Sequence, residues 1–355
     1  MEDAIIYCEG KFGTYTGKTA NGLVRYSRRF RILGVIDSRN AGRDAGEVLD
    51  GKRNGIPIYG SFEEALANQP GARYFIIGVA TIGGLLPQEY REVVVKAIKS
   101  GMNIVSGLHE YLSEDAELSA LASAHGVKLI DVRKPKPLKE MHQFRNLSRN
   151  LPCLRIPVLG TDGSIGKRTT ALILTDDLNR AGIRAVFVAT GQTGLMQGSQ
   201  YGVPLDAIRG DYMVGELESE IVRAYEEQKP DVIVVEGQGS ISHPAYVCGT
   251  RAIIMASQPS GIVCQHAPKR QYRNFGKDTL KLPMPDLRKE ITMLEMFSDA
   301  KVIAISLNHE NMSKEEIELW VKNYERDFGL PCCDALVHGT AKIVEVIRGM
   351  LRKTP

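Results

Sequence analysis

The stretch Leu154–Thr170 reads LRIPVLGTDGSIGKRTT. An apolar run ends at Gly160, a glycine-rich turn follows, and a helical pattern begins after Lys167. Strand, glycine turn, lysine and helix, in that order, suit a phosphate chain, because the turn's backbone N–H groups and the positive end of the helix dipole both attract anions. Lys167 adds a full positive charge. The stretch therefore predicts a site for a nucleotide or another diphosphate.

This predicted phosphate loop departs from the common spelling G-x-x-x-x-G-K-[ST]. Five residues separate Gly160 from Gly166, and Arg168 takes the place of the usual hydroxyl residue, with Thr169 one position later. The spelling resembles that of dethiobiotin synthetase and its ATPase relatives, whereas the alternative is an ordinary strand-to-helix turn. The residues expected to bind the cofactor are Gly160, Thr161, Asp162, Gly163, Ser164, Gly166, Lys167, Arg168, Thr169 and Thr170, with Gln192 and Thr193 from a later turn.

Two further apolar runs, Arg184–Ala189 and Asp231–Val235, each lead into a polar turn that contains glycines. In a parallel sheet both turns emerge at the same edge as the phosphate loop, where α/β folds bind ligands. The second turn starts with Glu236 in the spelling V-E-G-x-G, which resembles dethiobiotin synthetase, whose corresponding glutamate is a magnesium ligand. Glu236 and the Thr169 hydroxyl are therefore the predicted Mg²⁺ ligands. A turn or helix-capping glutamate is the alternative.

The composition is that of an ordinary globular protein. The chain has 355 residues, 43% of them hydrophobic and 25% charged, with a net charge of +3. This length predicts roughly two domains, and the charge balance gives no reason to expect nucleic acid or a membrane surface as a partner. The N-terminus lacks the pattern of a signal peptide, and no run approaches the ~20 apolar residues of a membrane helix. We expect a cytoplasmic homo-oligomer that acts on a small anionic molecule.

Six cysteines are scattered along the chain without a C-x-x-C pair, which predicts reduced thiols and no zinc site. The adjacent pair Cys332 and Cys333 suggests either a redox pair or small apolar side chains at the start of a strand.

The N-terminal part, residues 1–133, alternates strands with helices and predicts a Rossmann-like parallel sheet. Its expected strands are Ala4–Tyr7, Ile32–Ile36, Tyr74–Gly78, Asn103–Val105 and Val127–Ile130, with helices from Pro87 and over Ser113–Ala124. Asp37 stands where a dinucleotide fold has its ribose-binding carboxylate. The glycine-rich segment Glu9–Thr19 lacks the G-x-G-x-x-G spelling, so we do not expect NAD there; it is either a ligand-contacting loop or a plain surface loop.

Residues 134–150 are the predicted linker, because the alternating Lys134-Pro135-Lys136-Pro137 cannot continue a helix or pair centrally in a sheet. A short helix-like stretch is expected over Leu138–Arg149. Residues 151–355 form the second predicted domain, a P-loop NTPase-like parallel sheet with helices on both faces. Its further expected strands are Gly261–Gln265, Lys301–Leu307 and Ala335–Val337, and helices are expected to start at Asp286, Ser313 and Thr340.

Clustered cations follow the Gly261–Gln265 strand: His266, Lys269, Arg270 and Arg273. They suggest either a site for an anionic substrate or a second phosphate, or a solvated basic loop. Asp206 and Asp211 are further candidates for binding a metal or an amine.

Taken together, these motifs resemble a bacterial family long known only as a domain of unknown function, which includes the DgcN-type D-glutamate N-acetyltransferases. The resemblance rests on Gly160–Thr170, on Thr190–Gly194, and on Glu236–Ser240 with Ser242-His243-Pro244. It extends to Glu9-Gly10 and Lys18-Thr19 and covers nearly the whole chain. It implies a Rossmann-like domain, a P-loop domain, and acetyl transfer from acetyl-CoA to the amino group of D-glutamate.

Coenzyme A carries a diphosphate, so the phosphate loop is expected to hold acetyl-CoA, with ATP and Mg²⁺ as the alternative. Acetyl transfer needs a base for the amine proton and donors for the oxyanion. The candidate catalytic residues are His243 as the base, Glu236 for a metal or proton step, and Lys167 with loop N–H groups for the oxyanion. His243 is alternatively a turn residue. The alternatives to acetyl transfer are an ATP-dependent ligase or kinase acting on a small carboxylate, and a nucleotide-switched protein.

Overall fold

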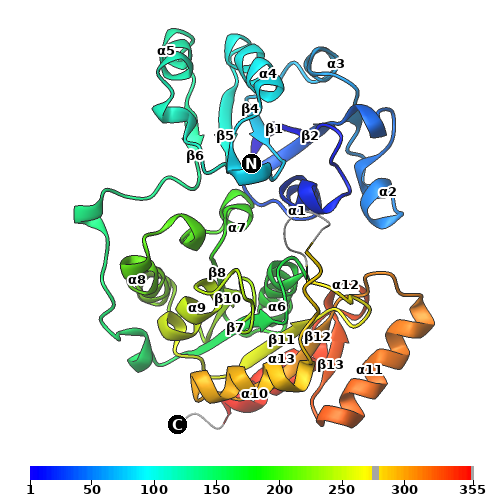
Figure 1. Ribbon diagram of the computed structural model, residues 1–355, viewed down its shortest axis with the longest axis vertical. Helices are drawn as coiled ribbons and strands as arrows, with labels where there is room; N and C mark the ends of the chain where they lie inside the picture. Colours follow the sequence, from blue (N-terminus) through cyan, green and yellow to red (C-terminus); the bar gives the residue numbers. More distant parts are fainter. Residues whose placement is uncertain (274–279, 353–355) are drawn as a thin grey trace. The chain divides into compact units, whose positions relative to one another are not determined.

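The computed structural model describes residues 1–273 and 280–352, apart from the side chain of Ile82 (Figure 1). The chain divides into two compact units. The N-terminal unit comprises Met1–Lys136 together with Gln192–Gly198, and the C-terminal unit comprises Pro137–Gly191 and Ser199–Pro355. Each unit contains its own parallel sheet.

The sheet of the N-terminal unit has six strands in the order β3-β2-β1-β4-β5-β6. Every pairing is parallel, so each connection must cross over the sheet, and the crossovers contain helices. The strand order reverses beside β1, as in Rossmann folds. The strands are β1 (Glu2–Tyr7), β2 (Phe30–Ile36), β3 (Ile58–Tyr59), β4 (Tyr74–Ile77), β5 (Asn103–Ser106) and β6 (Leu129–Asp131). The helices are α1 (Lys18–Arg25), α2 (Ala45–Asp50), α3 (Phe62–Asn68), α4 (Gln88–Lys99), α5 (Ala116–Ala124) and α7 (Gln192–Met196). This architecture confirms the predicted Rossmann-like sheet.

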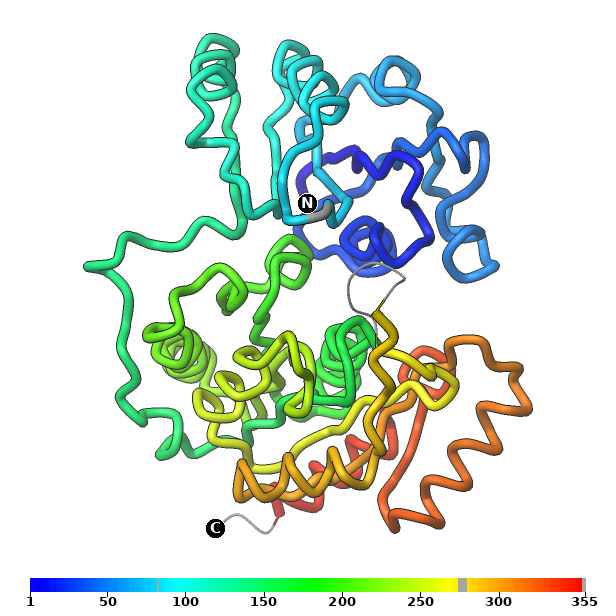
Figure 2. Tube along the Cα trace, in the orientation of Figure 1, coloured from blue at the N-terminus to red at the C-terminus, as the bar shows by residue number. Residues whose placement is uncertain are grey.

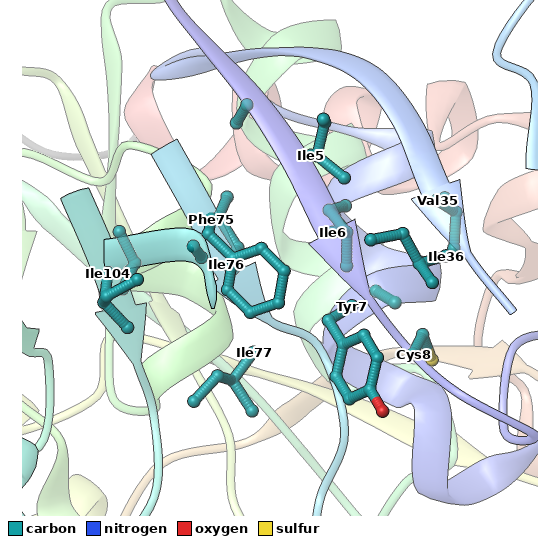
Figure 3. Close-up of a cluster of buried hydrophobic side chains, with 14 of the residues drawn as sticks. Ile5, Ile6, Tyr7, Cys8, Val35, Ile36, Phe75, Ile76, Ile77 and Ile104 are labelled. Carbon is teal, nitrogen blue, oxygen red and sulfur yellow. The ribbon is translucent and has the colours of Figure 1, made fainter. Parts of the chain in front are cut away.

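The core of this unit surrounds β1. Ile5 and Ile6 are completely buried although they point to opposite faces of the sheet, because helices cover both faces (Figure 3). The ring of Tyr7 stacks on that of Phe75 in β4, with ring centroids 5.7 Å apart. Continuous apolar runs such as Ala4–Tyr7 are thus the signature of a sheet buried on both sides.

Helix α7 is far from the rest of its unit in sequence. The backbone N–H of Arg28 donates to Gln197 O at 2.8 Å, and Gln197 Nε2 donates to Gly22 O at 2.8 Å. These bonds hold the segment after α7 against α1 and β2. The predicted linker at residues 134–150 marks one passage between the units. The chain also comes back to the N-terminal unit at Gln192–Gly198, which the prediction did not include.

The sheet of the C-terminal unit has seven parallel strands in the order β13-β12-β11-β7-β10-β8-β9. They are β7 (Leu154–Gly160), β8 (Ala185–Ala189), β9 (Tyr201–Gly202), β10 (Val232–Glu236), β11 (Ile262–His266), β12 (Val302–Leu307) and β13 (Cys332–Asp334). The helices are α6 (Lys167–Arg180), α8 (Gly210–Gln228), α9 (Gly249–Ser257), α10 (Leu287–Ser298), α11 (Lys314–Phe328), α12 (Ala335–His338) and α13 (Ala341–Leu351). The predicted P-loop sheet is confirmed, and the motif-bearing strand β7 is central.

Alternate residues of these strands pack on the two helical layers. Leu159, Ile233 and Val235 belong to one buried cluster with residues of α8, α9, α10 and α11. Helix α6 packs instead with α12 and α13. Both faces are covered, which again explains the continuous apolar strands.

Two predicted elements are wrong. Residues 335–337 were expected to form a strand, but the strand β13 lies just before them, at Cys332–Asp334. Residues 335–337 belong to helix α12, whose N-cap Asp334 accepts the N–H groups of Leu336 and Val337. The expected strand start at Cys332 and Cys333 is correct, since both are buried in β13. Helix capping by Asp334 therefore outcompetes the apolar pattern of Ala-Leu-Val.

The expected helical stretch Leu138–Arg149 is also absent. It contains 3₁₀ turns at Leu138–Glu140 and Ser148–Asn150 and is otherwise irregular, as its path in Figure 2 shows. Helix α8 binds this stretch through two buried carboxylates. Glu216 Oε1 accepts the N–H of His142 at 2.7 Å, and Glu218 accepts those of Arg145 and Leu147 at 2.8 and 2.7 Å. Backbone donors that a helix would use internally are thus satisfied by α8.

We predict that Glu218→Ala destabilises the C-terminal unit by roughly 2–3 kcal/mol, because it removes two charge-assisted hydrogen bonds to the linker backbone. Urea unfolding of the full chain measures the effect. Glu226→Ala is the matched control, since Glu226 is exposed on the same helix. Equal stability of the two variants would show that Glu218 does not anchor the linker.

Candidate functional site

The phosphate loop joins the end of β7 to the start of α6. A Cβ atom on Gly160 would lie 2.3 Å from Gln265 O in β11, so only glycine lets the end of β7 lie this close to β11. Ser164 and Gly166 both have positive φ, at 53° and 103°. Such left-handed residues turn successive N–H groups toward one side and create an anion-binding concavity. A Cβ on Gly163 would meet nothing within 4 Å, and Ser164 is exposed, so this part of the loop is open.

Lys167 is buried beneath the loop. Its Nζ donates to Asp162 O and, at 2.9 Å, to Gly239 O in the turn after β10. Burial lowers the pKa of Lys167 to about 8, and the Asp162 carboxylate opposes this shift. The ammonium therefore joins the two turns that the sequence placed at one edge of the sheet.

Gly237 makes room for the lysine. A Cβ at this position would lie 1.9 Å from Val158 O and 2.9 Å from Lys167 Cδ. The residue after Glu236 must therefore be glycine, because any Cβ would collide with the backbone of β7 and with the Lys167 side chain. This steric constraint explains the first glycine of the V-E-G-x-G sequence.

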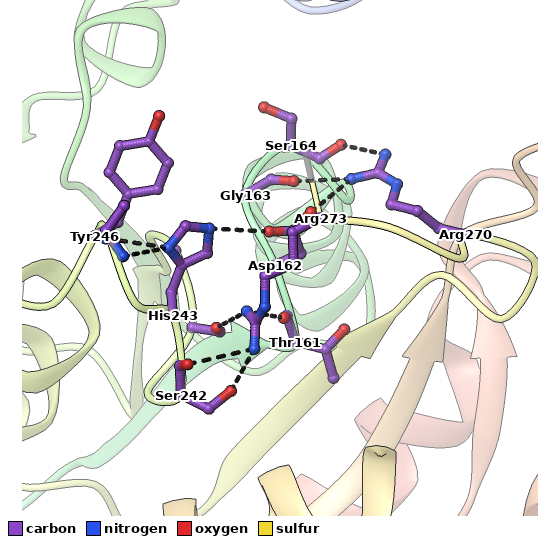
Figure 4. Close-up of polar contacts among 12 residues, drawn as sticks. Thr161, Asp162, Gly163, Ser164, Ser242, His243, Tyr246, Arg270 and Arg273 are labelled. Atoms are coloured by element: carbon purple, nitrogen blue, oxygen red, sulfur yellow. Dashed lines mark hydrogen bonds and ion pairs between the residues drawn. The ribbon is translucent and has the colours of Figure 1, made fainter. Parts of the chain in front are cut away.

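Arg270 and Arg273 hold the loop from the side of β11 (Figure 4). Arg270 Nη1 donates to Asp162 Oδ2 at 3.1 Å and to Gly163 O at 3.0 Å. Arg273 Nη1 donates to Thr161 O at 3.0 Å and to Ser240 Oγ at 2.7 Å. Because both guanidinium groups bind acceptors of the loop and its neighbouring turns, the geometry favours a role in shaping the loop.

The other two members of this cationic cluster also have protein partners. His266 Nδ1 lies 2.9 Å from Thr161 Oγ1, and burial lowers its pKa to about 4. Lys269 pairs with Glu316 at 2.5 Å. His266 is buried and does not belong to a solvated loop, whereas Lys269 is exposed and its ion pair lies at the surface.

His243 is buried beside the loop. Its Nδ1 accepts the N–H groups of Ala245 and Tyr246, both at 3.1 Å, and its Nε2 lies 3.5 Å from Asp162 Oδ1. Burial, followed by the Arg273 charge, lowers the pKa of His243. The imidazole is therefore neutral, with its proton on Nε2 facing Asp162. In this geometry the lone pair on Nδ1 is already used, which favours positioning the loop over removing a substrate proton.

Glu236 ends β10. Its Oε2 accepts the N–H groups of Thr190 and Gly191 at 3.0 and 3.3 Å. Burial raises the pKa of Glu236, while Arg168 and the two amides oppose this. A buried carboxylate with a raised pKa is suited to accept a proton.

The predicted Mg²⁺ ligands, Thr169 and Glu236, offer few oxygen atoms to a metal ion. Thr169 is half-buried at the start of α6, whereas the Thr170 hydroxyl donates to Gln265 Oε1 at 2.7 Å. Within residues 1–273 and 280–352, no group of three or more His, Cys, Asp or Glu side chains could hold a metal ion. Glu236 and Thr169 fit Mg²⁺ only if phosphates and water complete its shell.

The structure places Gln192 and Thr193 in the N-terminal unit. Gln192 Oε1 accepts from Arg133 Nη1 at 2.5 Å, and Thr193 Oγ1 lies 3.1 Å from Thr19 Oγ1. Both side chains are buried and form part of the packing of α7 within that unit. The other predicted cofactor residues lie together at the end of β7 and the start of α6.

Asp37 of the N-terminal unit is fully engaged. Its carboxylate accepts the N–H groups of Gly10, Phe12 and Arg39 and the Nδ2 of Asn40, at 2.9 to 3.1 Å. Its carboxylate therefore organises the segment that follows β1.

Two further residues support the loop, and no motif in the sequence pointed to them. Gln265 accepts the Thr170 hydroxyl, and Asn308 Nδ2 donates to Ile165 O at 2.9 Å. They lie at the carboxyl ends of β11 and β12. Ligand sites in parallel sheets form at these ends, so the position of each polar residue after an apolar strand was a usable signal.

The two halves of the chain match the two parts of one family. Residues 38–135 match the Rossmann-like domain DUF1611_N, and residues 142–344 match the P-loop domain DUF1611_C, both described as domains of unknown function. The chain belongs to the DUF1611 family. A crystal structure of a DUF1611 family protein from Anabaena variabilis is similar, with a TM-score of 0.90 and 31% identity over 98% of this chain and 100% of that one.

Two curated relatives of this DUF1611 protein have an activity in their names. A D-glutamate N-acetyltransferase from Tritonibacter scottomollicae is 35% identical over 292 residues, which are 81% of this chain and 84% of the relative. A D-glutamate N-acetyltransferase from Pseudoalteromonas sp. is 34% identical over 281 residues, or 77% and 81% of the two chains. Among the described residues, no helix has the length and apolar character that crossing a bilayer demands.

We predict that binding of a phosphate ligand weakens about five- to tenfold between pH 7 and pH 9. The Lys167 pKa of about 8 means that the free protein loses the ammonium over this range, so binding at pH 9 must take up a proton. Calorimetry with CoA in two buffers of different ionisation enthalpy measures both the affinity and the proton uptake.

The matched variant for this experiment is Lys167→Met, which keeps the length of the stem and removes the titration. It should bind CoA weakly at both pH values and take up no proton. A wild-type affinity that does not change with pH, without proton uptake, would contradict the role of Lys167.

Proposed function

We propose that this DUF1611 protein is an N-acetyltransferase that moves the acetyl group of acetyl-CoA to the amino group of D-glutamate or a similar small amino acid. The observation that carries the proposal is the combination of an open phosphate loop with about 35% identity, over most of the chain, to proteins named D-glutamate N-acetyltransferase. In the proposed reaction a base takes one proton from the ammonium group and the resulting amine attacks the thioester carbonyl. The C–S bond breaks, and the second proton lost by the nitrogen goes to the departing sulfur, so that CoA leaves as the thiol.

The phosphate loop is the proposed site for the diphosphate of CoA. Its open segment around Gly163 and Ser164 admits an anion, and Lys167 supplies a buried positive charge beneath it. Arg168 stands where Mg²⁺-dependent loops carry a hydroxyl residue. A guanidinium there suits binding of a diphosphate without a metal.

Glu236 is the proposed base. Its burial raises the carboxyl pKa, which suits removal of a proton from an ammonium group near neutral pH. The amides of Thr190 and Gly191 both donate to Oε2 and orient the carboxylate. His243, whose Nδ1 is occupied, is assigned to positioning Asp162.

The decisive experiment is product analysis with purified protein. We expect acetyl-CoA and D-glutamate to yield a free thiol and N-acetyl-D-glutamate, detected with a thiol reagent and by mass spectrometry. L-Glutamate and D-aspartate test the choice of acceptor. ADP released from ATP only with a small carboxylate would instead identify the ligase, and slow ATP hydrolysis without an acceptor would identify the nucleotide switch.

We predict that Glu236→Gln lowers kcat roughly 100- to 10,000-fold while the KM for acetyl-CoA changes less than about threefold, because the amide still accepts the two N–H groups but cannot take a proton. In the wild type the rate should rise with pH as the carboxyl group, whose pKa is raised, loses its proton. The variant should lack this rise.

Glu226→Gln, on the surface of α8, is the control for the loss of a carboxylate elsewhere. EDTA should leave the wild-type rate unchanged if Glu236 acts as a base. A rate that requires Mg²⁺ would instead support Glu236 as a metal ligand. Full activity of Glu236→Gln would show that Glu236 is neither the base nor a metal ligand.

A further inference from the structure

Two buried tyrosine hydroxyls lie at the carboxyl edge of the sheet in the N-terminal unit. Tyr7 is the last residue of β1, and Tyr90 lies in the first turn of α4, which follows β4. Each residue is 6% exposed, and in the part of the chain that the structure describes neither hydroxyl has a hydrogen-bond partner. A buried hydroxyl without a partner costs free energy, so a bound molecule that supplies the partner is favoured.

The packing of the two rings fixes where the hydroxyls lie. The rings of Tyr7 and Tyr90 meet edge to face, with centroids 5.0 Å apart and planes at 89°. In Figure 3 the Tyr7 hydroxyl points away from Phe75 and toward the carboxyl end of β1. Side chains of a helix tilt toward its N-terminus, so the Tyr90 ring lies over the start of α4. Both hydroxyls are therefore held in place before any ligand binds.

The surroundings of the hydroxyls offer both signs of charge. No side chain of the described ranges caps α4, so its first turn presents N–H groups and the positive end of the helix dipole. Burial raises the pKa of both tyrosines, that of Tyr90 to about 12, and the neighbouring Glu9 carboxylate adds to the shift. Both hydroxyls therefore keep their protons at neutral pH and can donate, beside one carboxylate.

The opposite face of the sheet is closed to a diphosphate. On that face the N–H of Ala20 in α1 donates to Gly78 O at 3.1 Å, and a Cβ atom on Gly78 would lie 2.8 Å from Ala20 Cβ. The end of β4 thus covers the start of α1, where dinucleotide folds bind a pyrophosphate. Asp37 in turn binds amides of the segment after β1. A ligand at this edge is therefore small and meets the tyrosine hydroxyls and the start of α4.

We propose that the N-terminal unit binds a small amino acid here, with its carboxylate on the hydroxyls of Tyr7 and Tyr90 and its ammonium group toward Glu9. Hydroxyl donors and a helix start suit a carboxylate, and a carboxylate suits an ammonium group. The strand order reverses beside β1, and parallel sheets bind ligands at such a reversal. The proposal concerns the N-terminal unit alone and does not depend on the proposed function.

The test variants are Tyr7→Phe and Tyr90→Phe, which keep the rings and remove the hydroxyls. Each should weaken binding of D-glutamate roughly 10- to 100-fold, because a hydrogen bond to a charged group is lost. Glu9→Gln should weaken binding of D-glutamate but not of glutarate, which lacks the ammonium group. Tyr74→Phe is the matched control, since the Tyr74 hydroxyl lies at the start of β4 and donates to Glu2 Oε1 at 2.6 Å.

Calorimetry on the full-length protein, with and without saturating CoA, measures the affinity for D-glutamate, L-glutamate and glycine. Urea unfolding without ligand is the second measurement. Tyr7→Phe and Tyr90→Phe should be as stable as the wild type, because each removes a hydroxyl that has no partner, whereas Tyr74→Phe should be less stable. A loss of affinity in the first two variants at unchanged stability supports the site.

Wild-type affinity for D-glutamate in both Tyr7→Phe and Tyr90→Phe would overturn the proposal. Failure of the wild type to bind any of the three amino acids would also overturn it. Acetyl transfer is scored separately. A KM for D-glutamate that rises in both variants, with an unchanged KM for acetyl-CoA, would identify the site as that of the acceptor. Binding that depends on the two hydroxyls, without acetyl transfer, would reject the proposed function alone, and transfer with unchanged D-glutamate affinity in the variants would reject this site alone.

Discussion

The buried ammonium group of Lys167 is the constraint on which the arrangement of the site depends. A charge removed from water must find acceptors, and here Asp162 O and Gly239 O provide them. These carbonyls belong to turns that follow β7 and β10, adjacent strands in the sheet. One side chain therefore sets the spacing of the two turns, and Gly237 must lack a side chain for Lys167 to reach them.

A second set of cations holds the outer side of the loop. Arg270 and Arg273 bind backbone carbonyls and the Asp162 carboxylate, and His243 faces the same carboxylate. A loop with left-handed residues at Ser164 and Gly166 is costly to order by itself. Hydrogen bonds from surrounding side chains stabilise this conformation before any ligand arrives, and such preorganisation lowers the cost of binding an anion.

Much of the fold could be predicted from the sequence because buried parallel strands are long apolar runs and their helices have capping signals. Ser313 forms a capping box with Glu316 where a helix was expected to start, and Asp286 caps α10. The strand expected at Ala335 failed because Asp334 caps a helix there. The helix expected at Leu138 failed because Glu216 and Glu218, some 70 residues away, take its backbone donors.

The sequence by itself determined the class of the fold, the phosphate loop and its place at the end of a central strand, since these follow from local periodicity, glycines and one lysine. Only the tertiary structure decided what each polar residue does. In the folded chain, His243 Nδ1 accepts two backbone N–H groups and the His243 ring stacks on that of Tyr246. Gln192 and Thr193 belong to the N-terminal unit. The physical reason is that hydrogen-bond partners and burial depend on residues far apart in the chain, which no local pattern records.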